Sequence, residues 1–298
     1  MSSAAYTKEG LINFHPTHDF FVGIDSDGCV FDTMEIKQKQ CFHGLIAEQW
    51  ALQSIEPLLR ETAEFVNLYS RSRGSNRFPA LLRTLDLLRD RPEAAAVTVP
   101  RMDHLRRWIE EETQLGMPAL EACVAATGDP ELAQVLAWSQ AVSRRIEEVV
   151  QQVPPFEGVR DCLHKIGTQA DAMVVSQTPT EDLVREWKVN GLLDAVAFIA
   201  GQELGTKAEH IAMATRDRYP GTHILMIGDA PGDCHAAQTN GALFYPINPG
   251  REEASWQCLF DESLDVFLAG GYAGAYERGL IDAFDALLPE TPPWMGGG

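Results

Sequence analysis

One short stretch decides the fold of this chain: Phe20-Phe21-Val22-Gly23-Ile24-Asp25-Ser26-Asp27-Gly28. It begins as an uncharged apolar run and ends in two carboxylates that are separated by a single residue. A continuous apolar run of this length is typical of a strand that is buried on both faces, as in a parallel sheet. The stretch therefore predicts a buried strand with acidic residues at its carboxyl end.

Four apolar runs of the same kind follow in the C-terminal half of the chain: Ala172–Val175, Ala195–Ala200, His223–Ile227 and Ala242–Ile247. Helical patterns alternate with them: Thr180–Asn190, Lys207–Tyr219 and Asp233–Thr239. Apolar strands separated by helices indicate a parallel sheet with both faces covered. We therefore predict the α/β class, with a Rossmann-like parallel sheet and helices on both of its faces.

A long helical segment interrupts this pattern between the first strand and the others. Its candidate helices are Glu35–Trp50, Ile55–Leu68, Pro79–Arg89, Asp103–Leu115, Ala119–Thr127 and Glu131–Val150. The organisation predicted is a discontinuous α/β catalytic domain, residues 1–32 and 156–298, with an inserted all-helical cap domain, residues 33–155. We expect Pro154-Pro155 to act as a hinge, and Pro289–Gly298 to form a loose tail.

The composition narrows the class of partner. The chain has 298 residues, 45% of them hydrophobic, and a formal charge of −19. Binding to nucleic acid or to an anionic membrane needs a basic surface, so both are disfavoured. The six cysteines are scattered without a CxxC pair, and no signal peptide or membrane-spanning run is evident, which leads us to expect a cytoplasmic protein with reduced thiols.

Residues that carry chemistry follow the predicted strands, and a lysine opens one helix: Asp25, Asp27, Ser176, Lys207, Asp229 and Asp233. Ligands of open parallel sheets bind beyond the carboxyl ends of the strands, so these side chains should share one rim. Crowded carboxylates need a cation, and Mg²⁺ with Asp25 and Asp229 as ligands suits them. A carboxylate beside a metal and an ammonium stays ionised, as a nucleophile must, and Asp27 can then serve as acid and base.

These motifs resemble those of the haloacid dehalogenase superfamily, in the same order. The first motif spans Phe21–Asp32, the second is Val174-Val175-Ser176, the third is Lys207 and the fourth spans Met226–Asp233. The resemblance covers the α/β part and implies that the insertion is a helical cap of the first type. It departs from the family at Cys29, where threonine is usual, and we expect Cys29 to be an inert core residue.

The resemblance implies a role for each matched residue. Asp25 attacks phosphorus to form an aspartyl phosphate, and Asp27 protonates the leaving oxygen and then activates water. Ser176 and Lys207 hold the phosphoryl group, and Gln177 joins them in substrate binding. The presence of Asp27 disfavours the dehalogenase and phosphonate-cleaving branches.

The resemblance also implies a metal site. Mg²⁺ is expected on the carboxylates of Asp25 and Asp229 and on the backbone carbonyl of Asp27, with Asp233 in support. A receiver domain gathers similar residues but in a different order, with its phosphorylated aspartate later in the chain.

An arginine-rich segment stands out within the insertion, Tyr69–Pro79, with Arg71, Arg73 and Arg77. Arginines on a cap loop can bind a carboxylate or a second phosphate, so Arg73 and Arg77 are candidate substrate contacts. The alternative is a surface loop whose arginines pair with acids of the protein itself.

The resemblance implies a Mg²⁺-dependent phosphatase that hydrolyses a small phosphate monoester, such as a sugar phosphate or another phosphorylated metabolite. A phosphomutase of the same superfamily shares these motifs. A non-catalytic binding module is the other alternative, although modules of that kind normally lose a nucleophile or a metal ligand.

Overall fold

The computed structural model describes residues 6–296, which divide into two compact units. The first unit contains the chain up to Thr33 together with Gln152–Leu288. The second unit contains Met34–Gln151 together with the segment that starts at Pro289. The breaks expected from the sequence, after residues 32 and 155, lie next to the first two of these boundaries, and the C-terminal segment is the difference.

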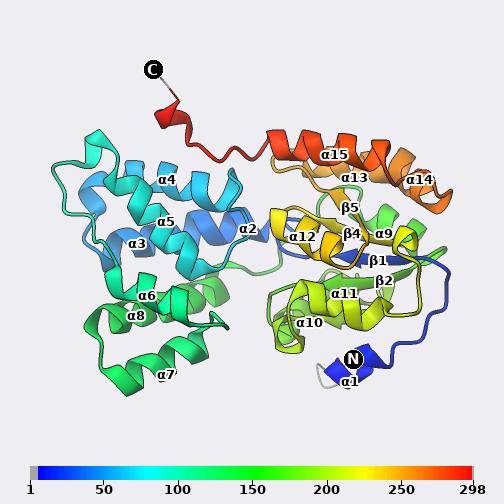
Figure 1. Cartoon of the computed structure of the whole chain (residues 1–298), viewed down its shortest axis with the longest axis horizontal. Helices are drawn as coiled ribbons and strands as arrows, with labels where there is room; N and C mark the ends of the chain where they lie inside the picture. Colours follow the sequence, from blue (N-terminus) through cyan, green and yellow to red (C-terminus); the bar gives the residue numbers. More distant parts are fainter. Residues whose placement is uncertain (1–5, 297–298) are drawn as a thin grey trace. The chain divides into compact units, whose positions relative to one another are not determined.

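The first unit is built on a five-stranded sheet in the order β3-β2-β1-β4-β5 (Figure 1). Its strands are β1 (Phe21–Ile24), β2 (Asp171–Val175), β3 (Phe198–Ala200), β4 (Ile224–Gly228) and β5 (Leu243–Pro246). Every neighbouring pair runs parallel, and every strand residue is buried. The predicted fold class is thus confirmed. The predicted strand Ala195–Ala200 is too long, because Ala195 ends a 3-10 helix (Leu193–Ala195) and only Phe198–Ala200 pairs with β2.

Helices flank the sheet on both sides (Figure 1). They are α1 (Lys8–Ile12), α9 (Val159–Gly167), α10 (Thr180–Val189), α11 (Lys207–Thr215), α12 (Pro231–Thr239), α13 (Glu252–Cys258), α14 (Leu264–Leu268) and α15 (Ala275–Ala286). Helices α11 and α12 pack side by side, and α9 packs against β2 and α13. Right-handed crossovers explain this division, because the chain reverses direction across the sheet between β3 and β4.

The register of the central strands brings their carboxyl ends to one edge. Ile24 of β1 pairs with Val174 of β2 on one side and with Ile227 of β4 on the other. The residues that follow these three strands therefore emerge next to one another. At the same edge Phe31 forms an isolated bridge with Pro155, so the two segments that lead to the insertion are held together.

The second unit is helical, and no strand occurs between residues 34 and 151, all of which the structure describes. Its helices are α3 (His43–Gln49), α4 (Glu56–Leu68), α5 (Arg77–Arg89), α6 (Asp103–Glu111), α7 (Met117–Thr127) and α8 (Pro130–Val149). A continuous helical stretch precedes α3, formed by α2 (Thr33–Ile36) and a π-helical segment (Lys37–Phe42). Trp50, Trp108 and Trp138 are buried in the core of this unit, as expected from the sequence.

The C-terminal segment is not the loose tail predicted from its composition. A short 3-10 helix spans Pro293–Met295, and the ring of Trp294 packs edge-on against Phe65 with 5.5 Å between centroids. The guanidinium of Arg91 lies 4.4 Å from the centre of the same ring. An indole provides a large apolar contact area at low entropic cost, and this contact anchors a segment that is otherwise rich in proline and glycine.

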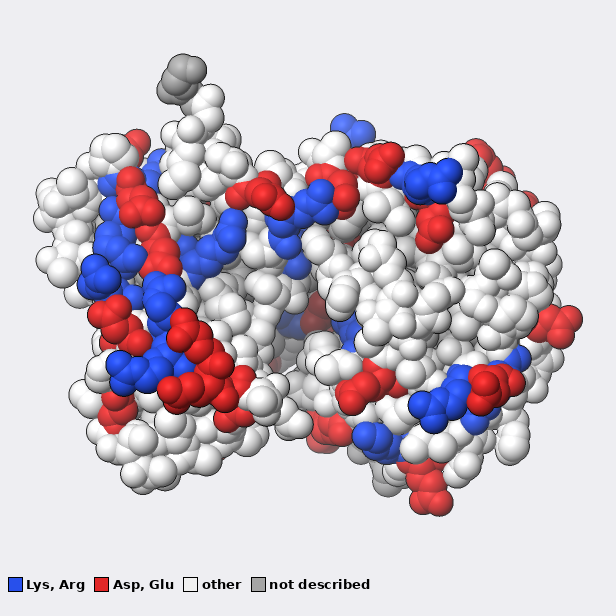
Figure 2. Space-filling model, viewed as in Figure 1, with Lys and Arg blue, Asp and Glu red and all other residues white. Residues whose placement is uncertain are grey.

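Charged side chains and cysteines are distributed over the described residues as follows. On the face drawn in Figure 2 acidic and basic side chains are interspersed, and ion pairs such as Arg106–Asp86 occur in the second unit. All six cysteines are free. Among the described residues no helix combines the length and the apolar character needed to cross a membrane.

Candidate active site

Asp25 follows β1 directly and is buried, with 3% of its surface exposed. Its backbone N–H continues the pairing with β4 by donating to the carbonyl of Ile227 (2.9 Å). Both side-chain oxygens are fixed: Oδ1 accepts from the N–H of Ser26 (2.8 Å), and Oδ2 lies 2.8 Å from Lys207 Nζ. The end of the central strand therefore presents one carboxylate in one orientation.

Lys207 is the first residue of α11, where Thr206 caps the helix by accepting from the N–H of Glu209. Its ammonium lies between two carboxylates, 2.8 Å from Asp25 Oδ2 and 2.6 Å from Asp233 Oδ1. Burial lowers the pKa of Lys207, but the charges of Asp233 and Asp25 outweigh burial and raise that pKa above its ordinary value. The two carboxylates therefore favour the charged form of Lys207.

Asp229 and Asp233 come from β4 and from the helix that follows it, and both are fully buried. Asp233 Oδ2 accepts from the N–H of Ala230 (3.0 Å) and so caps the first turn of α12. A Cβ atom on Gly228 would lie 2.4 Å from Asp233 Cβ, so only glycine allows this approach. The Gly-Asp-x-x-x-Asp pattern is therefore a compact strand-to-helix turn that brings two carboxylates to Asp25.

The balance of charge at the site is negative. Asp25, Asp229 and Asp233 each offer a ligand atom, and these atoms all lie within 4.8 Å of one another. Burial raises the pKa of Asp25 well above its ordinary value; Lys207 lowers that pKa, while Asp233 and Asp229 raise it further. A hard divalent cation offsets such an excess of charge, and an all-oxygen donor set is the one that Mg²⁺ prefers. The residues present therefore fit the metal that the sequence motifs imply.

Asp27 lies two residues after Asp25 on a tight turn. The turn is closed by a hydrogen bond from the N–H of Gly28 to the carbonyl of Phe31 (2.8 Å), with Gly28 at φ 77°. Two hydroxyls donate to the carboxylate of Asp27: Thr33 to Oδ1, and Thr178 to Oδ2 at 2.7 Å. Asp27 is half-buried, whereas Asp25 is buried.

Ser176 and Gln177 follow β2 at the same edge. Ser176 is buried, and its N–H donates to the carbonyl of Ala200 (3.0 Å), which continues the pairing with β3. Gln177 is exposed and donates through Nε2 to the carbonyl of Gly205 (2.9 Å). That bond ties the loop after β2 to the loop before Lys207.

The candidate arginines of the second unit bond within that unit. Arg73 is 3% exposed, and its Nη1 donates to the carbonyl of Leu68 (2.9 Å). Arg77 begins α5; its Nη1 donates to Ser139 Oγ (3.1 Å) and Ser143 Oγ (3.2 Å). Its guanidinium also lies over the ring of Phe42, 5.5 Å from the centroid, and burial lowers the pKa of Arg77.

Sequence reasoning missed three residues that support the site. Thr33 and Thr178 bond to Asp27, and Trp187 Nε1 donates to the hydroxyl of Ser26 (3.0 Å), between the two aspartates. Thr178 lies two residues after Ser176, and this closeness was the one available signal. Cys29 is buried, and burial raises the pKa of its thiol well above the ordinary value, as suits the inert role expected for it.

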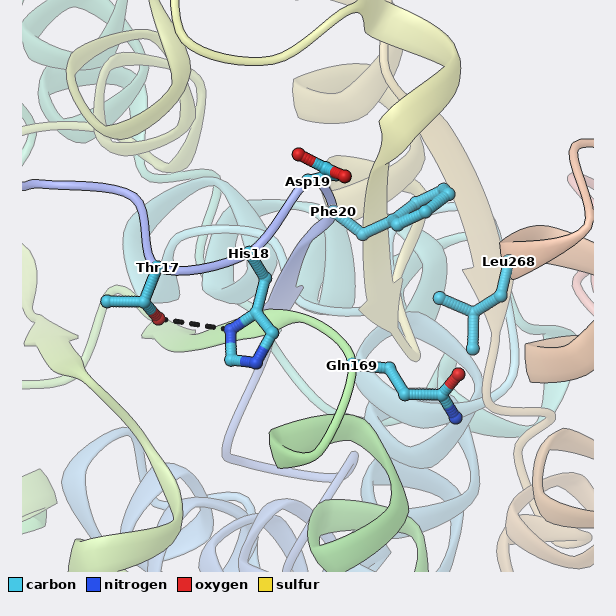
Figure 3. A pocket seen from close by; sticks show the side chains of 6 residues that line it. All are labelled: Thr17, His18, Asp19, Phe20, Gln169 and Leu268. Carbon is cyan, nitrogen blue, oxygen red and sulfur yellow. Dashed lines mark hydrogen bonds between the residues drawn. The ribbon is translucent and has the colours of Figure 1, made fainter.

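Two surface hollows lie at the other edge of the sheet, one of about 410 Å³ and one of about 620 Å³. Figure 3 shows the first, lined by the segment that enters β1, with the hydroxyl of Thr17 bonded to the ring of His18 (3.0 Å). The second hollow adjoins Asp171, the first residue of β2. Neither of these two hollows gathers several carboxylates around a lysine, whereas the carboxyl edge does.

Comparison of the sequence with family models and with curated proteins finds no match. Comparison of the fold with solved structures finds many, at low sequence identity. A predicted phosphoglycolate phosphatase from Haemophilus somnus is 14% identical, covers 77% of this chain and 86% of its own, and has a TM-score of 0.47.

Two further solved structures carry the name of the superfamily that the motifs resemble. A haloacid dehalogenase-like hydrolase from Streptococcus pneumoniae is 14% identical over 80% of this chain and 90% of its own, with a TM-score of 0.43. A HAD-superfamily hydrolase of subfamily IA from Geobacter sulfurreducens is 15% identical over 77% of this chain and 88% of its own, with a TM-score of 0.39. In fold, this chain is similar to hydrolases of the haloacid dehalogenase superfamily.

Proposed function

We propose that this protein is a Mg²⁺-dependent phosphatase that hydrolyses a small phosphate monoester through an aspartyl phosphate on Asp25. One observation carries the proposal: the buried carboxylate of Asp25 lies 2.8 Å from Lys207 Nζ, with Asp229 and Asp233 within reach of a shared metal. Nucleophilic attack on phosphorus requires an ionised carboxylate, and Lys207 favours that form because it lowers the pKa of Asp25 against the effect of burial.

The proposed reaction consists of two displacements at phosphorus, in which different residues act. In the first, a side-chain oxygen of Asp25 bonds to phosphorus, the ester P–O bond breaks, and Asp27 gives its proton to the leaving oxygen. In the second, Asp27 takes a proton from water, the water oxygen bonds to phosphorus, and the bond to Asp25 breaks to release phosphate. The hydroxyl of Ser176 and the ammonium of Lys207 would bind phosphoryl oxygens in both steps.

A bound Mg²⁺ would supply charge neutralisation on the phosphoryl oxygens. The carboxylates of Asp25 and Asp229 would hold it, with the carbonyl of Asp27. Asp233 acts through its contacts with Lys207 and Ala230, which keep the ammonium and the turn after β4 in place. Asp233 would then orient the ammonium of Lys207, and that ammonium would stabilise the charge of Asp25.

The substrate is proposed to be a small metabolite phosphate. Arg73 and Arg77 remain our candidate substrate contacts from the second unit, and both also have hydrogen bonds within that unit. Gln177 is exposed beside Ser176 and remains our candidate for a contact to the part of the substrate beyond its phosphate.

The test is phosphate release from a panel of phosphorylated metabolites, with and without Mg²⁺, for the wild type and for Asp25→Asn. We expect release that needs Mg²⁺ and that falls at least about a thousandfold in the variant, because an amide is not a nucleophile here. Asp282→Asn, on an exposed turn of α15, is the matched control and should retain full activity.

Two results would count against a phosphatase. Isomerisation of a sugar phosphate without phosphate release, dependent on an added bisphosphate, would indicate a phosphomutase. Absence of both activities, together with no change in thermal stability on addition of Mg²⁺, would indicate a non-catalytic module.

A further inference from the structure

Thr178 is a loop residue whose backbone is held by hydrogen bonds, and this fixes the position of its hydroxyl. Thr178 lies between β2 and α10, yet its N–H donates to Ser176 Oγ (3.2 Å) and its carbonyl accepts from the N–H of Gln202 (3.1 Å). A Cβ atom on Gly201 would lie 2.8 Å from the same carbonyl oxygen, so the loop after β3 packs directly on it. The backbone of Thr178 is thus held from two sides.

From this position the hydroxyl donates to Oδ2 of Asp27 at 2.7 Å, across 151 residues of sequence. The other oxygen of the same carboxylate accepts from Thr33, the last residue of the first unit before the chain enters the second. The two hydroxyls come from different segments of the chain. Thr33 belongs to the connection, whereas Thr178 belongs to the loops at the edge of the sheet.

We propose that Thr178 is a positioning residue that fixes the carboxylate of Asp27 for proton transfer to and from the oxygens at phosphorus. The inference rests on the function proposed above. An aspartate on a short turn has several staggered side-chain conformations, and proton transfer needs one of them. Misplacement of a reacting group by about 1 Å can cost about a hundredfold in rate, so one well-placed hydroxyl is enough to matter.

The role is distinct from binding of the phosphate. Ser176 and Lys207 are the groups proposed for the phosphoryl oxygens, and the hydroxyl of Thr178 is engaged with Asp27 instead. Loss of this hydroxyl should therefore slow turnover without weakening the binding of substrate.

The experiment compares Thr178→Val, which keeps the shape and removes the hydroxyl, with Thr178→Ser, which keeps the hydroxyl. With the best substrate of the panel, we expect Thr178→Val to lower kcat about 10- to 100-fold with KM changed less than about threefold. Thr178→Ser should restore kcat to within about threefold of the wild type. Thr178→Ala serves in place of the valine variant if the latter does not fold.

Thr180→Val is the matched control. Thr180 is the first residue of α10, two residues after Thr178, and its hydroxyl donates to the carboxylate of Glu203 (2.8 Å) and not to Asp27. This variant loses a hydrogen bond of the same kind, and we expect its thermal stability to fall while kcat stays within about threefold. An equal fall in kcat for both variants would overturn the inference, because it would reveal a general loosening of the loop.

A double-mutant cycle links the effect to Asp27. In an Asp27→Asn background, the change Thr178→Val should have no further effect on kcat, because there is no proton-transferring carboxylate left to position. Independent, multiplying effects would overturn the inference. If the wild type releases phosphate and Asp25→Asn abolishes it while Thr178→Val is fully active, only this inference fails. If the wild type releases no phosphate, the proposed function fails and takes this inference with it.

Discussion

Both edges of the sheet bury carboxylates, but the surroundings shift the pKa values of those carboxylates in opposite directions. At the carboxyl edge, Asp25, Asp229 and Asp233 share one lysine, and the pKa of Asp25 is raised well above its ordinary value by burial and by the other two acids. At the amino edge, Asp171 accepts from the N–H groups of Thr17 (2.9 Å) and His18 (3.0 Å) and from the hydroxyl of Tyr219 (2.7 Å).

The pKa of Asp171 at the amino edge is shifted in the direction opposite to that of Asp25 at the carboxyl edge. Burial raises the pKa of Asp171, but the hydrogen bonds from Thr17, Tyr219 and His18 outweigh burial and hold that pKa below its ordinary value. Hydrogen-bond donors favour the charged form of a buried carboxylate, whereas neighbouring carboxylates disfavour it. The two edges thus differ in how hydrogen bonds and neighbouring charges shift the pKa of a buried aspartate.

The largest effect is expected from Lys207→Met, which removes the ammonium that Asp25 and Asp233 share. Breaking a buried ion pair at one partner costs about 3–5 kcal/mol, so the free energy of unfolding at pH 7 should fall by about that amount in the absence of metal. Phosphate release should also be lost. Chemical denaturation measures the first effect, with Lys188→Met on the exposed side of α10 as the control.

The loss of unfolding free energy in Lys207→Met should depend on pH, because the pKa of Asp25 is raised in the folded protein. A carboxyl group with a raised pKa in the folded protein stabilises the fold at low pH and loses that contribution as the pH rises through the raised value. The deficit of Lys207→Met should therefore shrink as the pH is lowered, because Asp25 takes up a proton. A deficit that is constant with pH would mean that the lysine stabilises by packing alone.

A smaller effect is expected from Asp171→Asn at the amino edge. The amide cannot accept from all of the donors that the carboxylate satisfies, and we expect a loss of about 2–4 kcal/mol at pH 7 with phosphate release unchanged. Because the pKa of Asp171 is depressed in the folded protein, its contribution is present above the unfolded value of about 3.9 and disappears as the pH falls below it. Denaturation curves of the wild type and of Asp171→Asn should differ at pH 7, and the difference should be smaller at about pH 3. Loss of activity without loss of stability would contradict the division between the two edges.

The smallest effect is expected from Tyr219→Phe, which removes one donor to Asp171 and keeps the ring beside Phe21, 5.6 Å between centroids. The free energy of unfolding should fall by about 1–2 kcal/mol, as for one hydrogen bond to a charged group. The same change in the Asp171→Asn background should cost less, which a double-mutant cycle in urea would measure. Equal costs in both backgrounds would show that the hydroxyl does not act through Asp171.

Much of the carboxyl edge could be predicted because it depends on strand ends. Asp25, Ser176 and Asp229 each follow an apolar run directly, and parallel strands bring such positions together whatever the rest of the chain does. Lys207 could be placed by its position at a helix start. These predictions needed only short-range patterns and one rule of topology.

The partners of Asp27 and Asp171 could not be found in this way. Thr178 lies 151 residues from Asp27, and Thr17 lies 154 residues from Asp171. A lone threonine has no pattern that distinguishes a buried donor from a solvated turn residue. The anchoring of the C-terminal segment by Trp294 escaped prediction for the same reason, since proline and glycine around it favour a loose tail.

By itself the sequence determined the sheet, the interrupted α/β organisation and the set of acids and one lysine that meet at the carboxyl edge, because periodicity and strand ends are local properties of the chain. Only the tertiary structure decided what surrounds each buried acid. Donors from distant segments lower the pKa of Asp171, whereas two other carboxylates lie beside Asp25, which we propose as the nucleophile.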